Sequence, residues 1–365
     1  MNFAIMLEIN FKTIYNYHIN DKNGGRRMRE FTINANDAGQ RLDKFILKTV
    51  KGMPISLMYK AIRTKKIKVN RKRAEQKQML VQGDTVQMFL SEDLFSDKIT
   101  ENELLTVKVD LDIVYEDENL LICNKPAGIL VHSGDGDGKV SGDGDAKDRN
   151  TLIYSVQAYL AQKGEYDPAC ENSFAPALCN RIDRNTGGMV IAAKNAKALR
   201  AMNERIKNNE ITKFYLCAVC GKLPQKQDTL RDFLIKDSKT NTVRVLKKHV
   251  NGAKEIITKY EAIEYNAKKD ITLAKVELVT GRTHQIRAHM ASIGNSLLGD
   301  GKYGNIARHK SDGYKHQALY SYRLEFSRKD DDLSYLNGKT ITVRPESIYF
   351  LSEFTSRATE IVLEK

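Results

Sequence analysis

The feature that most constrains the fold is a series of short apolar segments between Asp110 and Gly281 that have the length and patterning of β-strands. Stretches with helical periodicity interrupt the series at residues 151–162, 197–208 and 283–293. Many strands with interspersed helices predict an α+β domain built on a large mixed or antiparallel sheet flanked by helices. The strand-like segments are LDIVYED, NLLICNKPAGILVHS, GGMVIAAKN, KFYLCAVCG, EIITKYEAIEY and TLAKVELVTG.

The size and composition of the chain are those of a globular protein with more than one domain. Its 365 residues suffice for two or three separate cores, and 41% are apolar while 29% are charged. The absence of any run of about 18 apolar residues excludes a membrane-spanning helix. The N-terminus lacks the pattern of a signal peptide, and five cysteines, an odd number, indicate reduced thiols. We therefore expect a cytoplasmic protein, most simply a monomer, that does not contact membranes.

The charge of the chain indicates a polyanionic partner. There are 59 Lys and Arg residues against 46 Asp and Glu residues, which gives a formal net charge of +13. Much of the excess lies in the block Arg41–Arg73, which holds 12 basic residues and one acidic residue, Asp43. So few acidic residues favour phosphate binding over an ordinary solvated surface. Charge alone does not separate RNA from DNA or an anionic membrane surface; the basic residues that we expect to contact phosphates are Lys60, Arg63, Lys65, Lys66, Lys68 and Arg71.

The same block has the pattern of a small folded module. Apolar residues recur at helical spacing at Leu42, Phe45 and Ile46, and the later segment KIKVN alternates like a strand before the turn in VQGDTV. The pattern predicts two short helices followed by a small β-hairpin unit. In the segments RLDKF, YKAIRTKKIKVNRK and QGD the block resembles the S-four-like RNA-binding domain, which is named after a ribosomal protein.

These observations divide the chain into four parts. Residues 1–27 form an extension that ends in Gly-Gly-Arg-Arg, and we expect Met28 to be the natural start, with an ordered extra strand before it as the alternative. Residues 28–95 form a small α/β RNA-binding domain. Residues 96–110 are polar and weakly periodic, as in a linker, and residues 111–365 form the larger, strand-rich domain.

Several motifs that suggest other chemistry fail on inspection. The segment GDGDGKVSGDGDAKDRN at residues 134–150 resembles a calcium loop, but Lys139 and Ala146 stand where oxygen ligands are needed, so we expect a surface loop. Cys217 and Cys220 have the spacing of a metal pair, but on a strand they point to opposite faces. His284 and His289 are five residues apart and do not share a helix face. The phosphate-binding glycine motifs are absent. We therefore predict neither a metal site nor a nucleotide cofactor.

Three motifs remain in which polar residues are embedded in or next to apolar strands. In NRIDRNTGGMVIAAK, Arg181 and Asp183 point to one side of an extended chain while Arg184 points away, and the glycine pair allows close backbone approach. KFYLCAV places Lys213 and Tyr215 on one strand face. VTGRTHQIRAHM supplies two further arginines at a strand-to-helix turn. Cations near a carboxylate favour its ionised form, which suits a nucleophile or base directed at a sugar carbon.

In these motifs the chain resembles the RluA-type pseudouridine synthases (RluC/RluD-like). The matching segments, in family order, span about residues 113–326. Two departures concern Asn180, where the family commonly has His, and Asn185-Thr-Gly-Gly, where it commonly has Asp-Thr-Ser-Gly. The matching segments are IVYEDENLLICNKPAGILVHSG, NRIDRNTGGMVIAAKN, KFYLCAVCG, LVTGRTHQIRAHMASIGNSLLGDGKYG and QALYSYRLEF.

The resemblance implies roles for individual residues. Asp183 corresponds to the essential aspartate, Tyr215 to the tyrosine that packs against the target uracil, and Arg287 to the arginine paired with the carboxylate. Arg181 corresponds to the arginine that helps to displace the base from the RNA stack. The implied reaction breaks the uridine glycosidic bond, turns the uracil and rejoins it through C5, without a metal or nucleotide cofactor. The candidate substrate-binding residues are Arg181, Arg184, Thr186, Lys213, Arg282 and His284.

The resemblance and the basic module together predict an enzyme that acts on structured RNA. Ribosomal RNA of the large subunit is the favoured substrate, and transfer RNA is the alternative within this enzyme class. A non-catalytic RNA-binding or ribosome-assembly protein is the alternative from another class. The sequence leaves open which uridine is modified and whether Asp183 attacks C1′ or removes the neighbouring 2′ proton.

Overall fold

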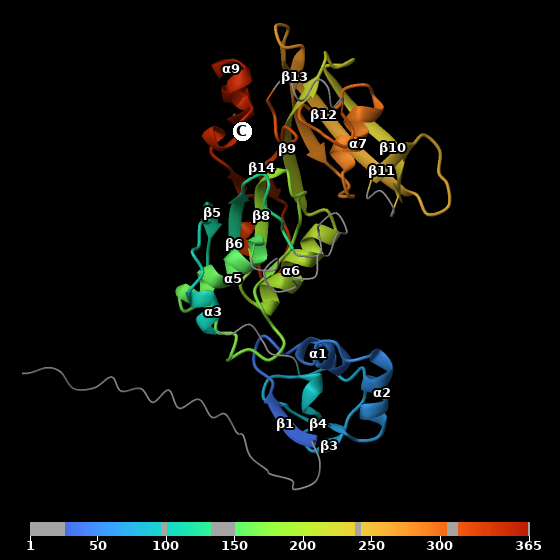
Figure 1. Ribbon diagram of the computed structural model, residues 1–365, viewed down its shortest axis with the longest axis vertical. Coiled ribbons are helices and arrows are strands. Elements are labelled where there is room, and N and C mark those ends of the chain that lie inside the picture. Colours follow the sequence, from blue (N-terminus) through green and yellow to red (C-terminus); the bar gives the residue numbers. More distant parts are fainter. Residues whose placement is uncertain (1–25, 96–100, 133–149, 238–241, 305–312, 364–365) are drawn as a thin grey trace, which may run out of the picture. The chain divides into compact units, whose positions relative to one another are not determined.

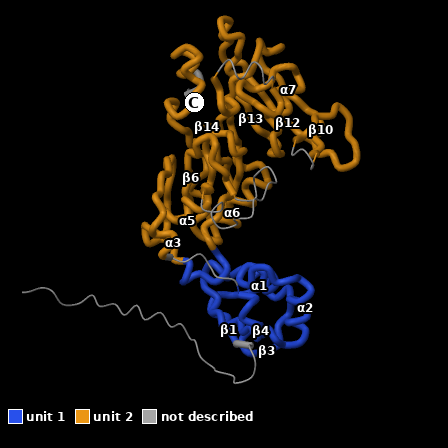
Figure 2. Tube along the Cα trace, viewed as in Figure 1, with its two compact units in different colours: residues 1–99, 168–174 blue, residues 100–167, 175–365 orange. Residues whose placement is uncertain are grey.

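The computed structural model describes residues 26–95, 101–132, 150–237, 242–304 and 313–363, and the chain forms two compact units (Figures 1 and 2). Unit 1 comprises residues 1–99 and 168–174, and unit 2 comprises residues 100–167 and 175–365. Within the described residues, no helix is long and apolar enough to cross a membrane.

Unit 1 has a four-stranded sheet against which two short helices pack. The strand order is β1-β4-β2-β3. The apolar residues that recur at helical spacing, Leu42, Phe45 and Ile46 on α1 and Ala61 and Ile62 on α2, are buried in one core, as amphipathic helices require. The elements are β1 (Arg26–Thr32), α1 (Leu42–Thr49), α2 (Ile55–Arg63), β2 (Ile67–Val69), β3 (Lys72–Arg73), β4 (Thr85–Ser91) and the 3-10 turn η1 (Glu92–Leu94).

A segment from the middle of the chain, residues 168–174, belongs to unit 1. Residues 168–174 are held there by Asp37, whose side chain is fully buried. Its Oδ1 accepts hydrogen bonds from the backbone N–H and hydroxyl of Ser173 at 3.1 and 2.6 Å. Its Oδ2 accepts one from the Asn172 amide at 2.6 Å. The sequence predicts instead that this segment belongs to the larger domain 111–365, because contacts across some 135 residues leave no local signal.

Unit 2 is built on an 11-stranded sheet, which confirms the predicted α+β class (Figure 1). The main strand order is β11-β10-β12-β13-β9-β14-β8-β6-β5, with β15 paired to β14 and β7 paired to β8. All recorded pairs are antiparallel except β14 with β8, so the sheet is mixed. The strands are β5 (Ile113–Glu116), β6 (Leu120–Lys125), β7 (Ala177–Leu178), β8 (Gly187–Ala193), β9 (Ile211–Cys220), β10 (Gln227–Asp237), β11 (Thr242–Leu246), β12 (Lys254–Asn266), β13 (Ile271–Leu278), β14 (Leu319–Phe326) and β15 (Thr340–Thr342).

Separate cores cover the two faces of this sheet. Along β8, Met189 and Ile191 enter one core while Val190 and Ala192 enter the other, as the alternation of strand side chains requires. Helix α6 (Ala196–Lys207) packs into the first core, and helices α5 (Leu152–Gln162) and α7 (Gln285–Ser292) pack into the second. The chain ends with η3 (Ser334–Leu336), η4 (Pro345–Ser347), η5 (Leu351–Glu353) and α9 (Ser356–Leu363).

Residues 101–110 of the predicted linker and both cysteines of CAVC lie within the described residues. Part of the expected linker is helical: α3 (Glu101–Leu105) buries Leu104 against Tyr154 and Ala158 of α5. The two cysteines of CAVC do point to opposite faces, since Cys217 lies in one core and Cys220 packs against the other. The proposed surface loop at 134–150 and the extension at 1–27 lie almost entirely outside the described residues, although β1 begins at Arg26, before Met28.

Candidate active site

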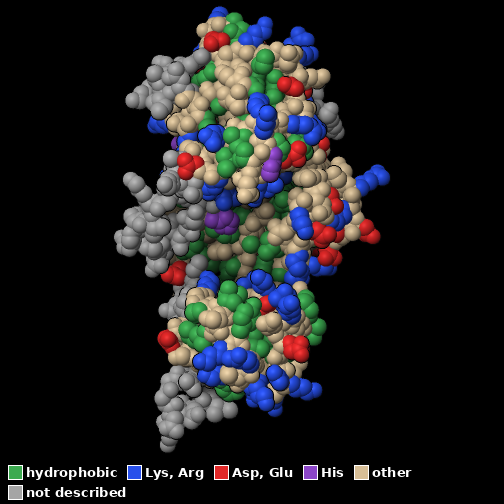
Figure 3. Space-filling model, turned by 90° about the vertical axis from the view of Figure 1, so that its right-hand side faces the viewer, with side chains coloured by type: hydrophobic (Ala, Val, Ile, Leu, Met, Phe, Trp, Pro, Cys, Tyr) green, Lys and Arg blue, Asp and Glu red, His purple; other side chains and the backbone are tan. Residues whose placement is uncertain are grey.

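One pocket of unit 2 brings together most of the residues predicted for the site. Its volume is about 620 Å³, which is within the range of small-molecule sites. Lys and Arg side chains gather around this hollowed part of the surface (Figure 3). Arg184 alone among the predicted catalytic and substrate-binding residues does not line it. The residues that do are Arg181, Asp183, Thr186, Lys213, Tyr215, Arg282, His284 and Arg287.

Asp183 lies in a tight turn immediately before β8. Its carbonyl oxygen accepts a hydrogen bond from the Thr186 N–H at 3.0 Å, which closes the turn. The Thr186 hydroxyl in turn accepts one from the Gln317 amide at 3.0 Å, and both of these side chains are buried. The Asp183 side chain keeps 24% exposure. The turn therefore presents a carboxylate to the pocket from a fixed backbone.

The glycine pair after this turn allows two backbones to meet. A Cβ on Gly187 would lie 2.4 Å from the Tyr320 ring, and one on Gly188 would lie 2.2 Å from the Ser321 carbonyl oxygen. Gly188 also has φ +114°, which side chains rarely tolerate. The parallel pairing of β8 with β14 depends on this close approach. Thr-Gly-Gly, where the family commonly has Thr-Ser-Gly, thus keeps small residues at the point where β8 and β14 approach each other.

Arg287 pairs with two carboxylates at once. Its Nη1 donates to Oδ2 of Asp183 at 2.8 Å, while its Nε and Nη2 donate to the two oxygens of Asp300, each at 2.8 Å. Asp300 is fully buried and Arg287 is 5% exposed. Burial opposes both charges, but the paired hydrogen bonds outweigh it, raising the pKa of Arg287 and lowering that of Asp300. Arg287 is therefore a fixed cation beside Asp183.

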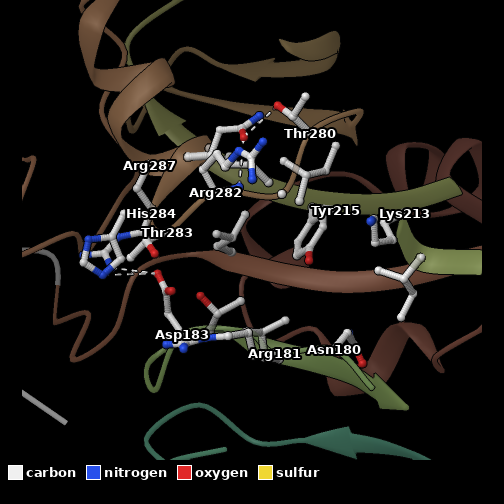
Figure 4. A pocket seen from close by; sticks show the side chains of 18 of the residues that line it. Asn180, Arg181, Asp183, Lys213, Tyr215, Thr280, Arg282, Thr283, His284 and Arg287 are labelled. Atoms are coloured by element: carbon white, nitrogen blue, oxygen red, sulfur yellow. Dashed lines mark hydrogen bonds and ion pairs between the residues drawn. The ribbon is translucent and has the colours of Figure 1, made fainter. Parts of the chain in front are cut away.

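His284 is the second polar group near this carboxylate (Figure 4). It caps α7 in the left-handed conformation, with φ 53°, and its Nε2 lies 3.8 Å from Oδ2 of Asp183. Its Nδ1 lies 2.9 Å from the hydroxyl of Tyr303, which also accepts the Val243 N–H at 2.9 Å. The hydroxyl can donate its proton to Nδ1 or accept one from it, according to the tautomer of the neutral ring. Burial lowers the pKa of His284; the charge of Asp183 opposes this shift and that of Arg287 adds to it, so that the neutral ring is favoured.

The turn that carries Arg282 is fixed by a buried amide. The Oε1 atom of Gln285 accepts hydrogen bonds from the Arg282 N–H and the Thr280 hydroxyl, at 3.1 and 2.9 Å. Its Nε2 donates to the carbonyl of Ile257 and the hydroxyl of Thr258, each at 3.0 Å. The amide oxygen thus accepts two hydrogen bonds and the amide nitrogen donates two, so that the side chain is fully hydrogen-bonded. The Arg282 side chain itself is exposed at the pocket rim.

Tyr215 and Lys213 line the pocket from the same face of β9. Tyr215 is 6% exposed, and burial raises the pKa of its hydroxyl to about 12. Lys213 is half-buried, and burial lowers the pKa of its ammonium. A tyrosine with this pKa stays protonated at neutral pH, so it offers a flat apolar surface and not an anion.

Lys125 holds the turn that carries Asp183 through the carbonyl of Arg184. The sequence did not indicate this role for Lys125. Its ammonium is fully buried and donates to the carbonyls of Pro126, Ile129 and Arg184, at 2.9, 3.0 and 3.0 Å. Burial lowers the pKa of Lys125 to about 7, and the negative charge of Asp183 offsets part of this shift. The Arg184 side chain donates to the Gly128 carbonyl at 2.9 Å. Arg184 therefore ties two loops together outside the pocket.

Asn180 has a backbone-pairing role where the family commonly has His. Its Oδ1 accepts the Ile191 N–H at 2.7 Å, and its Nδ2 donates to the Met189 carbonyl at 3.4 Å. The side chain thereby holds the chain before Asp183 alongside β8. This departure keeps the geometry of the turn.

The cations predicted to contact RNA lie in unit 1. Four of them are exposed and the other two, Lys66 and Lys68, are half-buried. Lys68 lies 5.6 Å from the centre of the Phe89 ring. Across the described ranges, none of the six forms an ion pair. Their charge therefore remains available for an anionic ligand.

Sequence reasoning missed the residues that support the site from behind. Asp300 and Tyr303 lie in the quoted segment GDGKYG, Lys125 in NKPAG and Gln317 in QALYS. Each of these polar residues lies in an apolar or glycine-containing segment, which is a possible sign of a functional role. Its interaction partner, however, lies too far away in the sequence to be predicted from local pattern. Among the described residues, no cluster of three or more His, Cys, Asp or Glu side chains could hold a metal ion.

Comparison with known proteins agrees with this geometry. The sequence profile of the family described as RNA pseudouridylate synthase matches residues 119–292. An uncharacterized RNA pseudouridine synthase of Mycoplasma genitalium is 33% identical over 309 residues, which cover 83% of this chain and 90% of the relative. Ribosomal large subunit pseudouridine synthase C of Haemophilus ducreyi is 31% identical over 305 residues, 81% of this chain and 87% of the relative.

A solved structure shares the fold. Human RNA pseudouridylate synthase domain containing 1 aligns with a TM-score of 0.52 at 18% identity, over 70% of this chain and 94% of that structure. The sequence relatives define the class: the chain belongs to the RNA pseudouridine synthase family, in its RluA-type branch. It is a pseudouridine synthase, as the resemblance predicted.

Proposed function

We propose that this enzyme isomerises uridine in ribosomal RNA of the large subunit, and that Asp183 acts on the ribose of the target uridine. The observation that carries the proposal is the Asp183 carboxylate held 2.8 Å from the buried Arg287 cation in a pocket next to Tyr215. Relatives named for the ribosomal large subunit support the choice of RNA.

The two carboxylate oxygens of Asp183 are in different situations. Oδ2 accepts the hydrogen bond from Arg287, whereas Oδ1 has no hydrogen-bond donor among the described residues. An anion that is held by one oxygen and open at the other suits attack on C1′ or removal of the 2′ proton. Both paths remain compatible with this arrangement.

The pocket requires an extruded nucleotide, because C1′ and C5 of a stacked uridine are out of reach. Tyr215 supplies a flat face on which the uracil rests. Arg181 is exposed at the rim, two residues from Asp183, where a guanidinium can enter the space that the base leaves. These roles follow those that the family resemblance implies.

Unit 1 is proposed to supply phosphate contacts that are independent of sequence. If all six cations contact phosphates, log Kd should change with log salt concentration with a slope of about 4 to 5. Replacing the six by Gln tests this better than deleting residues 1–95, because the deletion would also remove Asp37, which binds residues 168–174. We expect weaker RNA binding with little change in kcat at saturating RNA.

Tritium release from transcripts labelled at uridine C5 tests the proposed substrate, since C5 loses its proton when the base is rejoined. Transcripts of large-subunit ribosomal RNA and a pool of transfer RNA are compared. Release from the ribosomal transcripts alone is expected. Release from transfer RNA alone would refute the proposed substrate, and release from neither would favour a non-catalytic role. Mapping pseudouridines with and without the gene then identifies the site.

A further inference from the structure

Lys213 is a pocket residue whose place in the sheet puts it away from the Asp183 turn. On β14, Ser321 pairs both with Gly188, at the start of β8, and with Tyr215 of β9. Lys213 pairs with Leu324 and precedes Tyr215 by two residues on β9, which separates the two by roughly 7 Å. Figure 4 shows Asp183 on one side of Tyr215 and Lys213 on the other. Tyr215 thus lies between an anionic end and a cationic end of the pocket.

The Lys213 ammonium has no partner in the part of the chain that the structure describes. It forms neither a hydrogen bond nor an ion pair there, although it is half-buried. Other shielded lysines of unit 2 are paired: Lys125 binds three carbonyls, and Lys194 binds two glutamates. A shielded charge without a partner costs stability. Such a group is expected at a functional site, where a ligand completes it.

The depth of Lys213 indicates which part of the RNA it meets. The other unbonded cations of the pocket, Lys207 and Arg282, are exposed at the rim, where phosphates of the RNA backbone would pass. Lys213 lies deeper, beside the Tyr215 ring. An ammonium group has three donors and no acceptor, and uracil offers two carbonyl oxygens, whereas cytosine has an amino donor in place of one.

We propose that Lys213 donates a hydrogen bond to a carbonyl oxygen of the extruded uracil and stabilises the negative charge that the base acquires during the reaction. This role rests on the proposed function of the same pocket. It makes Lys213 a substrate-contacting residue that favours uracil over cytosine.

The charge balance of the reaction supports this role on either path for Asp183. When the C1′–N1 bond breaks, its electron pair stays with the base, and the uracil anion shares the charge among N1, O2 and O4. Turning the base about its N3–C6 axis exchanges the two carbonyls, so a fixed ammonium meets a carbonyl before and after the turn. The C5–C1′ bond then forms, the C5 proton leaves, and N1 takes up a proton. An ammonium preorganised for the anion lowers the barrier to its formation.

The test uses Lys213→Met, Lys213→Gln and, as a matched control, Lys226→Met, which removes an exposed lysine outside the pocket. The substrate is a synthetic RNA of the mapped segment with uridine, 2-thiouridine or 4-thiouridine at the target. Loss of a hydrogen bond to a charged group predicts a kcat about 10- to 150-fold lower for Lys213→Met. Lys213→Gln, which keeps a donor without the charge, should lie between Lys213→Met and the wild type, and Lys226→Met should match the wild type.

The thio substrates separate a base contact from a phosphate contact. Sulfur accepts hydrogen bonds weakly, so at least one substitution should slow the wild-type protein more than it slows Lys213→Met. Equal thio effects in both proteins, with only a raised KM in the variant, would indicate a phosphate contact and overturn the proposal. Thermal unfolding should give Lys213→Met a Tm at or above that of the wild type, because an unpaired charge is removed; a clearly lower Tm would overturn the premise that the ammonium has no partner.

The outcome also distinguishes this role from the proposed function. No turnover by the wild type on any RNA would refute the proposed function and the role of Lys213 with it. Full activity of Lys213→Met beside an active wild type would refute the role of Lys213 alone.

Discussion

Asp300 is the residue whose replacement tests most sharply how the site is held together. Both of its oxygens accept hydrogen bonds from Arg287, and Oδ1 also accepts the backbone N–H groups of Lys302 and Tyr303, at 2.9 and 3.2 Å. Asp300→Asn keeps the shape but removes the charge and one acceptor. Within the described residues, Arg287 then has Asp183 as its only anionic partner, and its orientation is no longer fixed from behind.

The expected magnitudes follow from the burial of this pair. Breaking a buried ion pair costs about 3–5 kcal/mol, and the low end applies because Asn keeps one acceptor and Asp183 remains. About 3 kcal/mol corresponds to a Tm lower by roughly 6–12 °C for a domain of this size. A displacement of about 1 Å at a reacting group costs on the order of 100-fold in rate. We therefore expect kcat to fall about 100-fold.

Asp331→Asn is the matched control, because it makes the same change in another two-point ion pair. Asp331 accepts from Nε and Nη2 of the fully buried Arg205 at 2.7 and 2.6 Å, and neither residue lines the pocket. Tritium release is measured at a temperature well below both Tm values. The account predicts that both variants lose stability but only Asp300→Asn loses kcat. Equal losses of kcat, or an Asp300→Asn protein with wild-type kcat, would refute the positioning role.

Three further predictions concern the frame around the site. Gly188→Ala should lower Tm strongly or abolish folding, because its Cβ would lie 2.2 Å from the Ser321 carbonyl oxygen, whereas Gly301→Ala, with nothing within 4 Å, should not; equal Tm values in circular dichroism would contradict this. Lys125→Met should lose about 3–5 kcal/mol in urea unfolding, since three carbonyls lose their donor, and a loss below about 1 kcal/mol would argue against the anchor. Burial would raise the pKa of Glu116, but hydrogen bonds from Lys163 and Lys194 lower it to about 2. Ionised Glu116 therefore stabilises the fold fully above about pH 4.5 and progressively less as the pH falls toward 2, so Glu116→Gln should make acid unfolding less steep; an unchanged pH dependence would exclude this contribution.

Local patterns predicted the elements because each element carries its own periodicity. The alternation along GGMVIAA and KFYLCAV follows from burial on both faces of one sheet, and the structure places these strands in it as β8 and β9. Arg181 and Asp183 both line the pocket, as do Lys213 and Tyr215, and the direction of side chains on an extended chain had suggested each of these two pairs. Local reasoning also gave Arg184 its correct direction, away from the pocket, although the residue was still included among the substrate contacts.

The remainder depended on contacts between residues far apart in the chain. Arg287 and Asp183 are separated by 104 residues, and only the family resemblance linked them. Nothing near Asp300 or Lys125 in sequence indicates that each is fully buried against its partners. Residues 168–174 and α3 were misjudged for the same reason, since polar, aperiodic segments become ordered only through the surface on which they pack.

The most direct measurement compares the wild type with Asp183→Asn, which has nearly the same shape, under single-turnover conditions on C5-tritiated large-subunit ribosomal RNA. Fluorescence anisotropy, run in parallel, verifies that both proteins bind the RNA with similar affinity. The account predicts tritium release by the wild type and none by the variant. Release by Asp183→Asn at a rate near that of the wild type would contradict the central role of this carboxylate.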